Sequence, residues 1–207
     1  MKKCILMSVF LLWFCGCGGP KIQKTRFLSD YSRLQKRSET SFIYAPSPER
    51  LGGYSKFMVD PVQVHFHTGS KAIEERTKGK LKEQDIIDLK NYMHAAMVKA
   101  LSDRYEIVYH RGPGVARVKV ALTDLKKSEP ILNIMPAAKA SGAGLGAATM
   151  EAEIIDSQTG KQLRALVEMQ TGSRLSLDGL SKWGDAKGVM DKWAKSLRKR
   201  IDEAHGN

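Results

Sequence analysis

The chain has 207 residues, of which 34 are basic and 22 acidic, so its formal net charge is +12. All three cysteines lie within the first 17 residues, which excludes a disulfide or a cysteine metal site in the rest of the chain. No Gly-aromatic RNA motif, zinc-finger spacing or recognition-helix signature accompanies the basic charge, so the familiar nucleic-acid-binding classes are excluded.

The first sixteen residues have the parts of an export signal. Lys2 and Lys3 form a basic start, residues 5–14 form an apolar run, and Gly16 is a small residue suited to a cleavage site. The apolar run is too short to span a bilayer. This pattern predicts export, with removal of a signal peptide over residues 1–16.

Residues 14–17, Phe-Cys-Gly-Cys, resemble the lipobox of bacterial lipoproteins. In that motif a small residue precedes a cysteine that is acylated, so the resemblance implies cleavage between Gly16 and Cys17 and a lipid on Cys17. An ordinary secretory signal is the alternative. The polar residues that follow predict a flexible tether over residues 17–26, before a single domain over residues 27–207.

If the protein is exported, its basic surface would meet anionic components of the envelope rather than nucleic acid. In a bacterial envelope, the anionic candidates are phospholipid, lipopolysaccharide and the carboxylates of peptidoglycan. The alternative is an ordinary solvated surface, because Lys and Arg are spread along the whole chain.

Alternating apolar residues predict a strand between residues 54 and 66, interrupted at Asp60-Pro61. His65 and His67 lie two residues apart, so both are expected on one face, where paired imidazoles would suit zinc. The sequence specifies no third ligand, and two solvated histidines are the favoured alternative. We therefore predict neither a metal site nor a cofactor.

The middle of the chain alternates between helical and strand patterns. Residues 83–101 carry apolar side chains at helical spacing and acidic residues in the first turn, which predicts an amphipathic helix. Residues 105–110 and 116–122 flank a Gly-Pro-Gly turn, which predicts a hairpin. Residues 150–155 and 163–169 predict a second hairpin.

On the second hairpin, Glu151 and Glu153 share one strand face. Two nearby carboxylates can perform acid/base chemistry, but we favour cross-strand pairing with Arg164, and also with Lys119 or Arg117, on an open face of the sheet. The sequence has no Gly-x-Ser-x-Gly elbow and no phosphate loop, so it offers no positive sign of an enzyme.

The segment 131–148 combines apolar residues with alanines and glycines. It predicts either a mobile apolar loop that contacts a membrane or a partner, or a loop packed on its own domain.

Residues 185–203 predict a final amphipathic helix with a basic exposed side. A candidate interaction face is formed by Lys192, Lys195, Arg198 and Lys199. Such a face can bind anionic lipid heads or a partner, or can simply be solvated. Trp183 and Trp193 are candidates for a membrane interface or for the core, and the apolar stripe of the helix favours the core for Trp193.

Two helices and about five strands predict an α/β (α+β) two-layer sandwich, with the two main helices packed on one face of a mixed sheet.

Several segments spread over the chain also carry a family resemblance. They are Phe27-Leu-Ser-Asp-Tyr31, Phe57-Met-Val-Asp-Pro-Val62, Ala121-Leu-Thr-Asp124, residues 151–160, and Trp193-Ala194. Together they resemble the bacterial lipoprotein family called domain of unknown function 3313. The resemblance implies an envelope lipoprotein without an assigned activity.

These observations predict a lipid-anchored bacterial envelope lipoprotein that binds or scaffolds an envelope component without catalysis. Gly18 follows Cys17 where many inner-membrane lipoproteins carry aspartate, which favours the outer membrane and a domain facing the periplasm. The alternatives are a peripheral binder of anionic lipid or peptidoglycan and an envelope hydrolase. Expected partners are the membrane, through the lipid, and an envelope protein, anionic lipid or peptidoglycan; neither nucleic acid nor a small-molecule substrate is indicated.

Overall fold

One mixed β-sheet organises the chain in the computed structural model, which describes residues 22–47, 49–173 and 177–206. Within these residues the sheet has eight strands, in the order β1-β2-β8-β7-β6-β3-β5, with β4 beside β6. The strands are β1 (Gln35–Ser38), β2 (Ser41–Tyr44), β3 (Lys56–Val59), β4 (Gln63–Val64), β5 (Glu106–Ile107), β6 (Val115–Lys126), β7 (Ala147–Asp156) and β8 (Gln162–Thr171). The helices are α1 (Glu49–Gly52), α2 (Lys71–Thr77), α3 (Glu83–Ser102), α4 (Pro130–Ile134), α5 (Pro136–Ser141), the short 3-10 helix η1 (Asp178–Leu180) and α6 (Gly184–Ala204).

The long antiparallel strands β6, β7 and β8 form the middle of the sheet. Ile154 of β7 lies opposite Val118 of β6 on one side and opposite Arg164 of β8 on the other. The β7–β8 pair confirms the second predicted hairpin. The predicted interruption of the early strand is also confirmed, because β3 and β4 are separate segments that both run parallel to β6.

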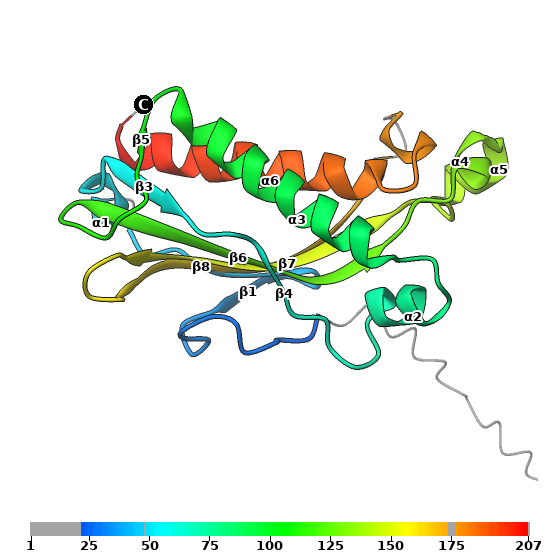
Figure 1. The fold of residues 1–207 in the computed structure, drawn as a ribbon, viewed down its shortest axis with the longest axis horizontal. Helices are drawn as coiled ribbons and strands as arrows, with labels where there is room; N and C mark the ends of the chain where they lie inside the picture. Colours follow the sequence, from blue (N-terminus) through cyan, green and yellow to red (C-terminus); the bar gives the residue numbers. More distant parts are fainter. Residues whose placement is uncertain (1–21, 48, 174–176, 207) are drawn as a thin grey trace, which may run out of the picture.

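Helices α3 and α6 lie next to each other and cover one face of the sheet (Figure 1). Their bounds confirm the two predicted helices to within one residue at either end. Every third or fourth residue of each helix is buried and packs on alternate residues of β6 and β7. The largest of these buried side chains are Leu89, Met93, Met97, Leu101, Met190, Trp193 and Ile201.

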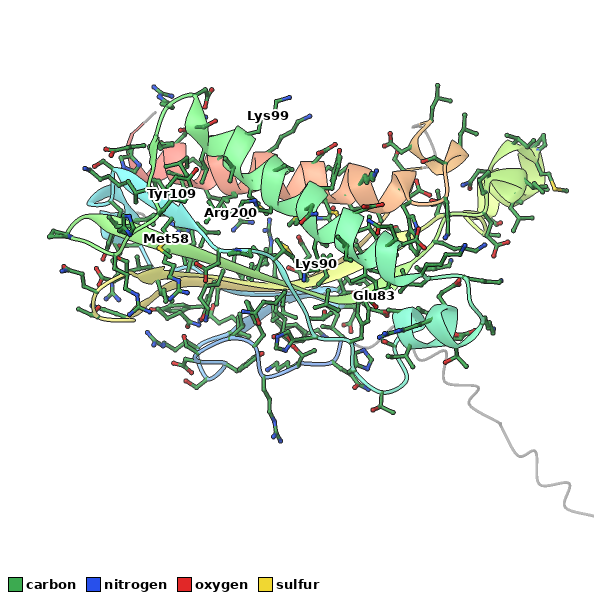
Figure 2. All side chains as sticks on the ribbon, in the orientation of Figure 1. Met58, Glu83, Lys90, Lys99, Tyr109 and Arg200 are labelled. Atoms are coloured by element: carbon green, nitrogen blue, oxygen red, sulfur yellow. The ribbon has the colours of Figure 1, made fainter. Side chains whose placement is uncertain are left out.

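The opposite face of the sheet is covered by residues 22–34, which we call the N-terminal strap. Phe27 and Leu28 are buried there against Ala121, Ala165 and Val167. Side chains therefore fill the space on both sides of the central strands (Figure 2). The strap replaces the open, solvated face that the sequence predicted for the hairpins.

The sheet is also larger than the about five strands predicted. The added strands include β1 and β2, which pair antiparallel and extend the sheet beyond β8. All four residues of β1 are exposed and polar, so no apolar alternation marks this segment as a strand.

The first predicted hairpin is wrong. Strand β3 lies between β5 and β6, and both pair with it in parallel. The inserted strand contributes to the core, since its residue Phe57 is fully buried and contacts Tyr105 edge to face, with ring centroids 5.2 Å apart. The turn at residues 112–114 therefore crosses past β3 instead of joining two adjacent strands.

Candidate functional site

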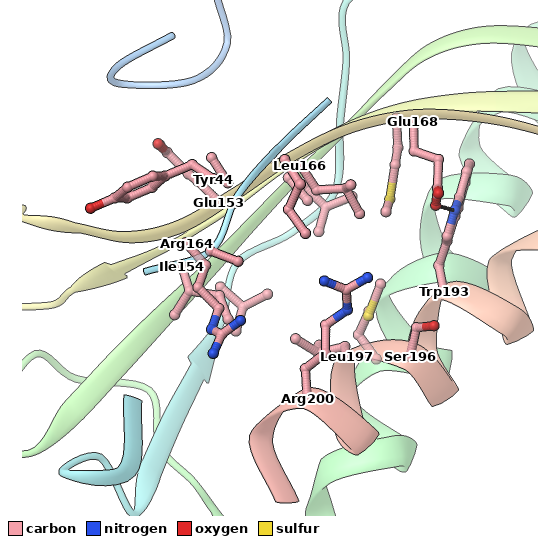
Figure 3. Close-up of a pocket in the computed structure, with 18 of the residues that line it drawn as sticks. Tyr44, Glu153, Ile154, Arg164, Leu166, Glu168, Trp193, Ser196, Leu197 and Arg200 are labelled. Carbon is pink, nitrogen blue, oxygen red and sulfur yellow. Dashed lines mark hydrogen bonds between the residues drawn. The ribbon is translucent and has the colours of Figure 1, made fainter. Parts of the chain in front are cut away.

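A groove opens between α6 and the edge of the sheet formed by β1, β2 and β8 (Figure 3). Its cavity volume is about 610 Å³, which lies in the range of small-molecule sites. The floor and inner wall are apolar and consist of Ile43, Met97, Ala152, Ile154, Leu166, Trp193 and Leu197. The groove exists because the two long helices cover β6 and β7, while the short strands β1 and β2 continue the sheet beyond them.

Two arginines reach into this groove from opposite sides, Arg164 from β8 and Arg200 from α6 (Figure 3). Both side chains are partly buried. Within the described residues, neither guanidinium has a hydrogen bond or an ion pair. Burial lowers the pKa of Arg164, and the positive charge of Arg200 lowers it further. The carboxylate of Glu203, which also lines the groove, offsets this in part by raising the pKa of Arg164. The two guanidinium groups therefore place positive charge that is only partly balanced over an apolar floor.

The rim of the groove is mixed but mainly basic. Arg37 and Lys199 add two further cations. Glu168 is already engaged, because its Oε2 accepts hydrogen bonds from Trp193 Nε1 at 2.7 Å and from the side chain of Gln170 at 2.9 Å. No histidine or cysteine is among the described residues that line the groove. This donor set suits binding of an anion that carries an apolar portion, and it contains no nucleophile paired with a base.

The sequence analysis missed this pair of arginines, and its placement of Arg164 was wrong. Arg164 was expected beside Glu151 and Glu153, but the register sets it opposite Ile154, on the face covered by the helices. The alternation of side chains within β8 divides its residues between two faces, but it does not show which of these faces lies on the same side of the sheet as Glu151 and Glu153 of β7. The register is fixed by a bulge between Ile154 and Ile155, which the sequence pattern does not mark.

The two glutamates share a face as predicted, but the N-terminal strap covers them, leaving Glu151 0% and Glu153 1% exposed. Glu151 accepts a hydrogen bond from the backbone nitrogen of Thr25 at 2.6 Å and another from the Tyr31 hydroxyl. Glu153 is bound by Ser29 and forms an ion pair with Lys119 at 2.6 Å. Pairing with Lys119 is thus confirmed.

The third expected partner, Arg117, points elsewhere and binds Asp60, with Nη2 and Oδ2 2.7 Å apart. The acid/base interpretation of the glutamates has no geometric support, since both are sealed beneath the strap.

The protonation of this buried cluster follows from its contacts. Burial alone would raise the pKa of Glu153, but hydrogen bonds from Lys119, Ser29 and Gln162 outweigh it and leave the pKa below its usual range. Burial, followed by the hydrogen bond to Glu151, raises the pKa of Tyr31 to about 12. At neutral pH the carboxylate of Glu153 is therefore ionised and Tyr31 is a hydrogen-bond donor. Both groups hold the strap in place.

The candidate basic face of α6 divides into two kinds of residue. Lys192, Lys195 and Lys199 are exposed, and Lys199 Nζ lies 3.8 Å from Glu203. Arg198 instead ties α6 to the end of α3, because it pairs with Asp103 and donates to the carbonyl oxygen of Ala100 at 2.8 Å. It also pairs with Asp202 of its own helix at 2.8 Å. Only the three lysines are presented to solvent, and their role in binding stays a prediction.

The two candidate zinc residues contact other groups. A ring nitrogen of His65 lies 2.9 Å from the side-chain oxygen of Gln63, and a ring nitrogen of His67 lies 3.0 Å from the carbonyl oxygen of Thr68. In the described part of the chain, no group of three His, Cys, Asp or Glu residues is arranged to hold a metal ion.

Both tryptophans of the domain are buried, with Trp183 8% and Trp193 2% exposed. The core assignment of Trp193 is confirmed, and an interfacial role for Trp183 is not supported. The segment 131–148 forms α4 and α5 at one end of the molecule, with exposed apolar side chains (Figure 1).

The predicted cleavage site at Gly16 and the predicted lipidation site at Cys17 lie outside the described residues. No helix among the residues that the structure describes is both long enough and apolar enough to cross a bilayer.

Several solved structures align with this chain at low sequence identity. A PelC dodecamer from Paraburkholderia phytofirmans aligns at 11% identity, covering 78% of this chain and 96% of that one, with a TM-score of 0.43. A protein of Xanthomonas campestris aligns at 11% identity over 74% and 90%, with a TM-score of 0.40. Lipoprotein GNA1162 of Neisseria meningitidis aligns at 13% identity over 72% and 99%, with a TM-score of 0.31.

A search of the curated proteins finds no match to this chain. A family model does match, over residues 23–197, which is most of the sequence and includes the strap, the whole sheet and most of α6. The chain therefore belongs to the family described as protein of unknown function DUF3313.

Proposed function

We propose that this chain is a lipid-anchored envelope lipoprotein that binds an anionic amphiphile in the groove between α6 and β8, without catalysis. The observation that carries the proposal is the pair Arg164 and Arg200, which face an apolar floor and, within the described residues, have no direct hydrogen bond or ion pair, Glu203 acting on Arg164 only from a distance. Leaving two cations partly buried and unpaired is unfavourable, so their presence is best explained by a ligand that supplies the missing negative charge.

The chemistry of the groove defines the ligand class. Guanidinium groups bind phosphate and carboxylate through paired hydrogen bonds, so the head of the ligand is one of these anions. The apolar floor suits a hydrocarbon chain, and the volume suits one chain rather than a folded protein segment. The lipobox at Gly16 and Cys17 supports attachment to a membrane, and Gly18 supports the outer membrane facing the periplasm. Anionic amphiphiles of this kind are abundant at such a surface.

Binding is tested on the lipidated protein in nanodiscs of zwitterionic phosphatidylcholine, titrated with octyl phosphate, octanol and inorganic phosphate. Trp193 lines the groove, so its fluorescence reports occupancy, and a Trp183→Phe background leaves it the sole tryptophan of the mature chain. We expect octyl phosphate to bind more tightly than either octanol or phosphate, because only it satisfies both the arginines and the floor.

The matched variants are Arg164→Gln with Arg200→Gln against Lys192→Gln with Lys195→Gln. Each pair removes two positive charges, but only the first removes them from the groove. Hydrogen bonds to charged groups contribute about 1.5–3 kcal/mol each, so the first pair should weaken binding at least tenfold and the second should leave it almost unchanged. Equal affinities of the two double variants would refute the proposed site.

A further inference from the structure

The short helix α4 has its polar and apolar sides reversed relative to an ordinary surface helix. Asn133 is buried at 8% exposure, while Ile131 and Ile134 are 74% and 67% exposed. Asn133 donates hydrogen bonds to the carbonyl oxygens of Gly144 at 3.0 Å and Gly179 at 2.9 Å. The helix therefore directs its apolar side chains outward because its one amide is needed inside.

The neighbouring segments extend this apolar surface. The bond from Asn133 to Gly179 holds η1 against α4. Together α4 and the residues around η1 carry five of the seven large apolar side chains that are exposed in the described chain: Ile131, Ile134, Met135, Leu177 and Leu180. We call these five residues the apolar end. Such a concentration of exposed apolar side chains is typical of a surface that contacts lipid or a partner.

The apolar end is held firmly by the domain. The buried carboxylate of Asp185, at the start of α6, accepts hydrogen bonds from the Ser128 hydroxyl and the Gly146 nitrogen, both at 2.8 Å. These residues lie on the two chain segments that lead into and out of α4 and α5. The exposed side chains are thus presented at a fixed place relative to the sheet.

The strap runs toward this same end. Thr25 binds Glu151 and Ser29 binds Glu153, so going backward along the strap leads toward Ala147, where β7 begins directly after the segment of α4 and α5. Cys17 lies five residues before Ile22, and five residues of fully extended chain reach only about 17 Å. A lipid on Cys17 would therefore keep this end of the domain close to the bilayer.

The charges near the apolar end are of both signs. Lys126 is the last residue of β6 and Lys127 follows it at the root of the segment, while the acidic Glu129 precedes α4 and Asp178 begins η1. Within the described residues neither lysine has an ion-pair partner. Apolar side chains flanked by lysines are the combination that binds at the headgroup level of anionic membranes.

We propose that the apolar end inserts into the surface of the bilayer that holds the lipid on Cys17, so that the domain has a fixed orientation on the membrane. The proposal rests on the lipid anchor of the proposed function, but not on the groove. It commits to lipid as the contact; a second copy of the chain or another protein would be a different result.

The test uses the lipidated protein in vesicles of phosphatidylethanolamine and phosphatidylglycerol, with one introduced cysteine carrying a polarity-sensitive fluorophore. Ile134→Cys labels the apolar end. Tyr109→Cys is the control, because Tyr109 is 81% exposed and lies at the opposite end of the domain (Figure 2). We expect nitroxide-bearing lipids to quench the label at position 134 at least threefold more than the label at position 109.

Three results would overturn the inference or its basis, and they are distinguishable. Equal quenching at the two positions refutes docking of the apolar end. A signal at position 134 that depends on protein concentration but not on nitroxide lipid refutes the bilayer as the contact and indicates a second copy. Labelling of Cys17 itself shows that the anchor is absent, and this result refutes the anchored form of both proposals while leaving octyl phosphate binding in the groove to be judged on its own titration.

Discussion

Ser29 binds the carboxylate of Glu153 twice, through its backbone nitrogen at 2.9 Å and through its hydroxyl at 2.7 Å. The two residues are 124 positions apart, so this contact fastens the strap to the middle of the sheet. We predict that Ser29→Ala lowers the free energy of unfolding by about 1 kcal/mol, because the backbone bond stays while the hydroxyl loses its bond to Glu153 and the long bond that it accepts from Gln162 at 3.4 Å. Chemical denaturation measures the change. Ser32→Ala is the control, since Ser32 lies on the same segment and bonds only to exposed Asp30; an equal loss there would contradict the assignment.

A larger loss is expected from Glu153→Gln. The substitution leaves Lys119, only 21% exposed, beneath the strap without its counter-ion. Breaking one partner out of a buried ion pair costs about 3 kcal/mol or more. Amide hydrogen exchange of the strap, compared with exchange of α3, should show that the strap opens first. Unchanged protection of residues 25–31 would show that the pair does not hold the strap.

The same carboxylate predicts how stability depends on pH. The pKa of Glu153 is lowered in the folded protein, so the folded state gains stability from its ionised form above the unfolded pKa of about 4.3. This contribution is lost as the pH falls below that value and through the folded pKa. The difference in unfolding free energy between the native chain and Glu153→Gln should therefore shrink on acidification from pH 6 to pH 3. A constant difference would mean that Glu153 is not the group that titrates.

Arg198 and the nearby lysines of α6 should behave differently on substitution. Arg198→Ala removes the ion pair with Asp202 within α6, and also the bonds to Asp103 and the Ala100 carbonyl that join α6 to the end of α3. We expect it to lower the free energy of unfolding by about 1–3 kcal/mol, whereas Lys195→Ala should change it by less than about 0.5 kcal/mol. Thermal unfolding at two salt concentrations measures both. Equal effects would place Arg198 with the solvated lysines.

A substitution of Arg164 is expected to stabilise the protein rather than destabilise it. Arg164 is partly buried, has no ion-pair partner among the described residues, and faces the charge of Arg200. Arg164→Met keeps much of the apolar stem and removes the unpaired charge, so it should raise the free energy of unfolding by about 0.5–1 kcal/mol while weakening binding of octyl phosphate. A destabilised variant would indicate that Arg164 supports the fold rather than a ligand.

The parts of the fold that depend on local pattern were predictable. The helices α3 and α6 carry apolar side chains at every third or fourth position over about five turns, so their extent follows from periodicity alone. The hairpin of β7 and β8 is equally local, because its two strands are joined by a short turn. These elements make up most of the core.

The parts that depend on contacts distant in sequence were not predictable. The polar strand β1 is held by its backbone pairing with β2, and β3 lies between β5 and β6, where its Phe57 is buried. The groove could not be predicted from the sequence for the same reason. Arg164 belongs to β8 and Arg200 to α6, and only the register of β8 and the position of α6 bring the two side chains to one place. A local pattern contains no information on either.

The strap would give the proposed lipid anchor on Cys17 a mechanical role. Any force on the lipid would be carried along the chain to Thr25 and Ser29, and through them to the two central glutamates of the sheet. The hydrogen bonds to Glu151 and Glu153 would then bear the force and break one after another, beginning with the bond from Thr25. In a domain held in this way the strap would separate from the sheet before the helical side of the core unfolds, and a protease that cuts within the peeled strap would then release the rest of the domain from the membrane.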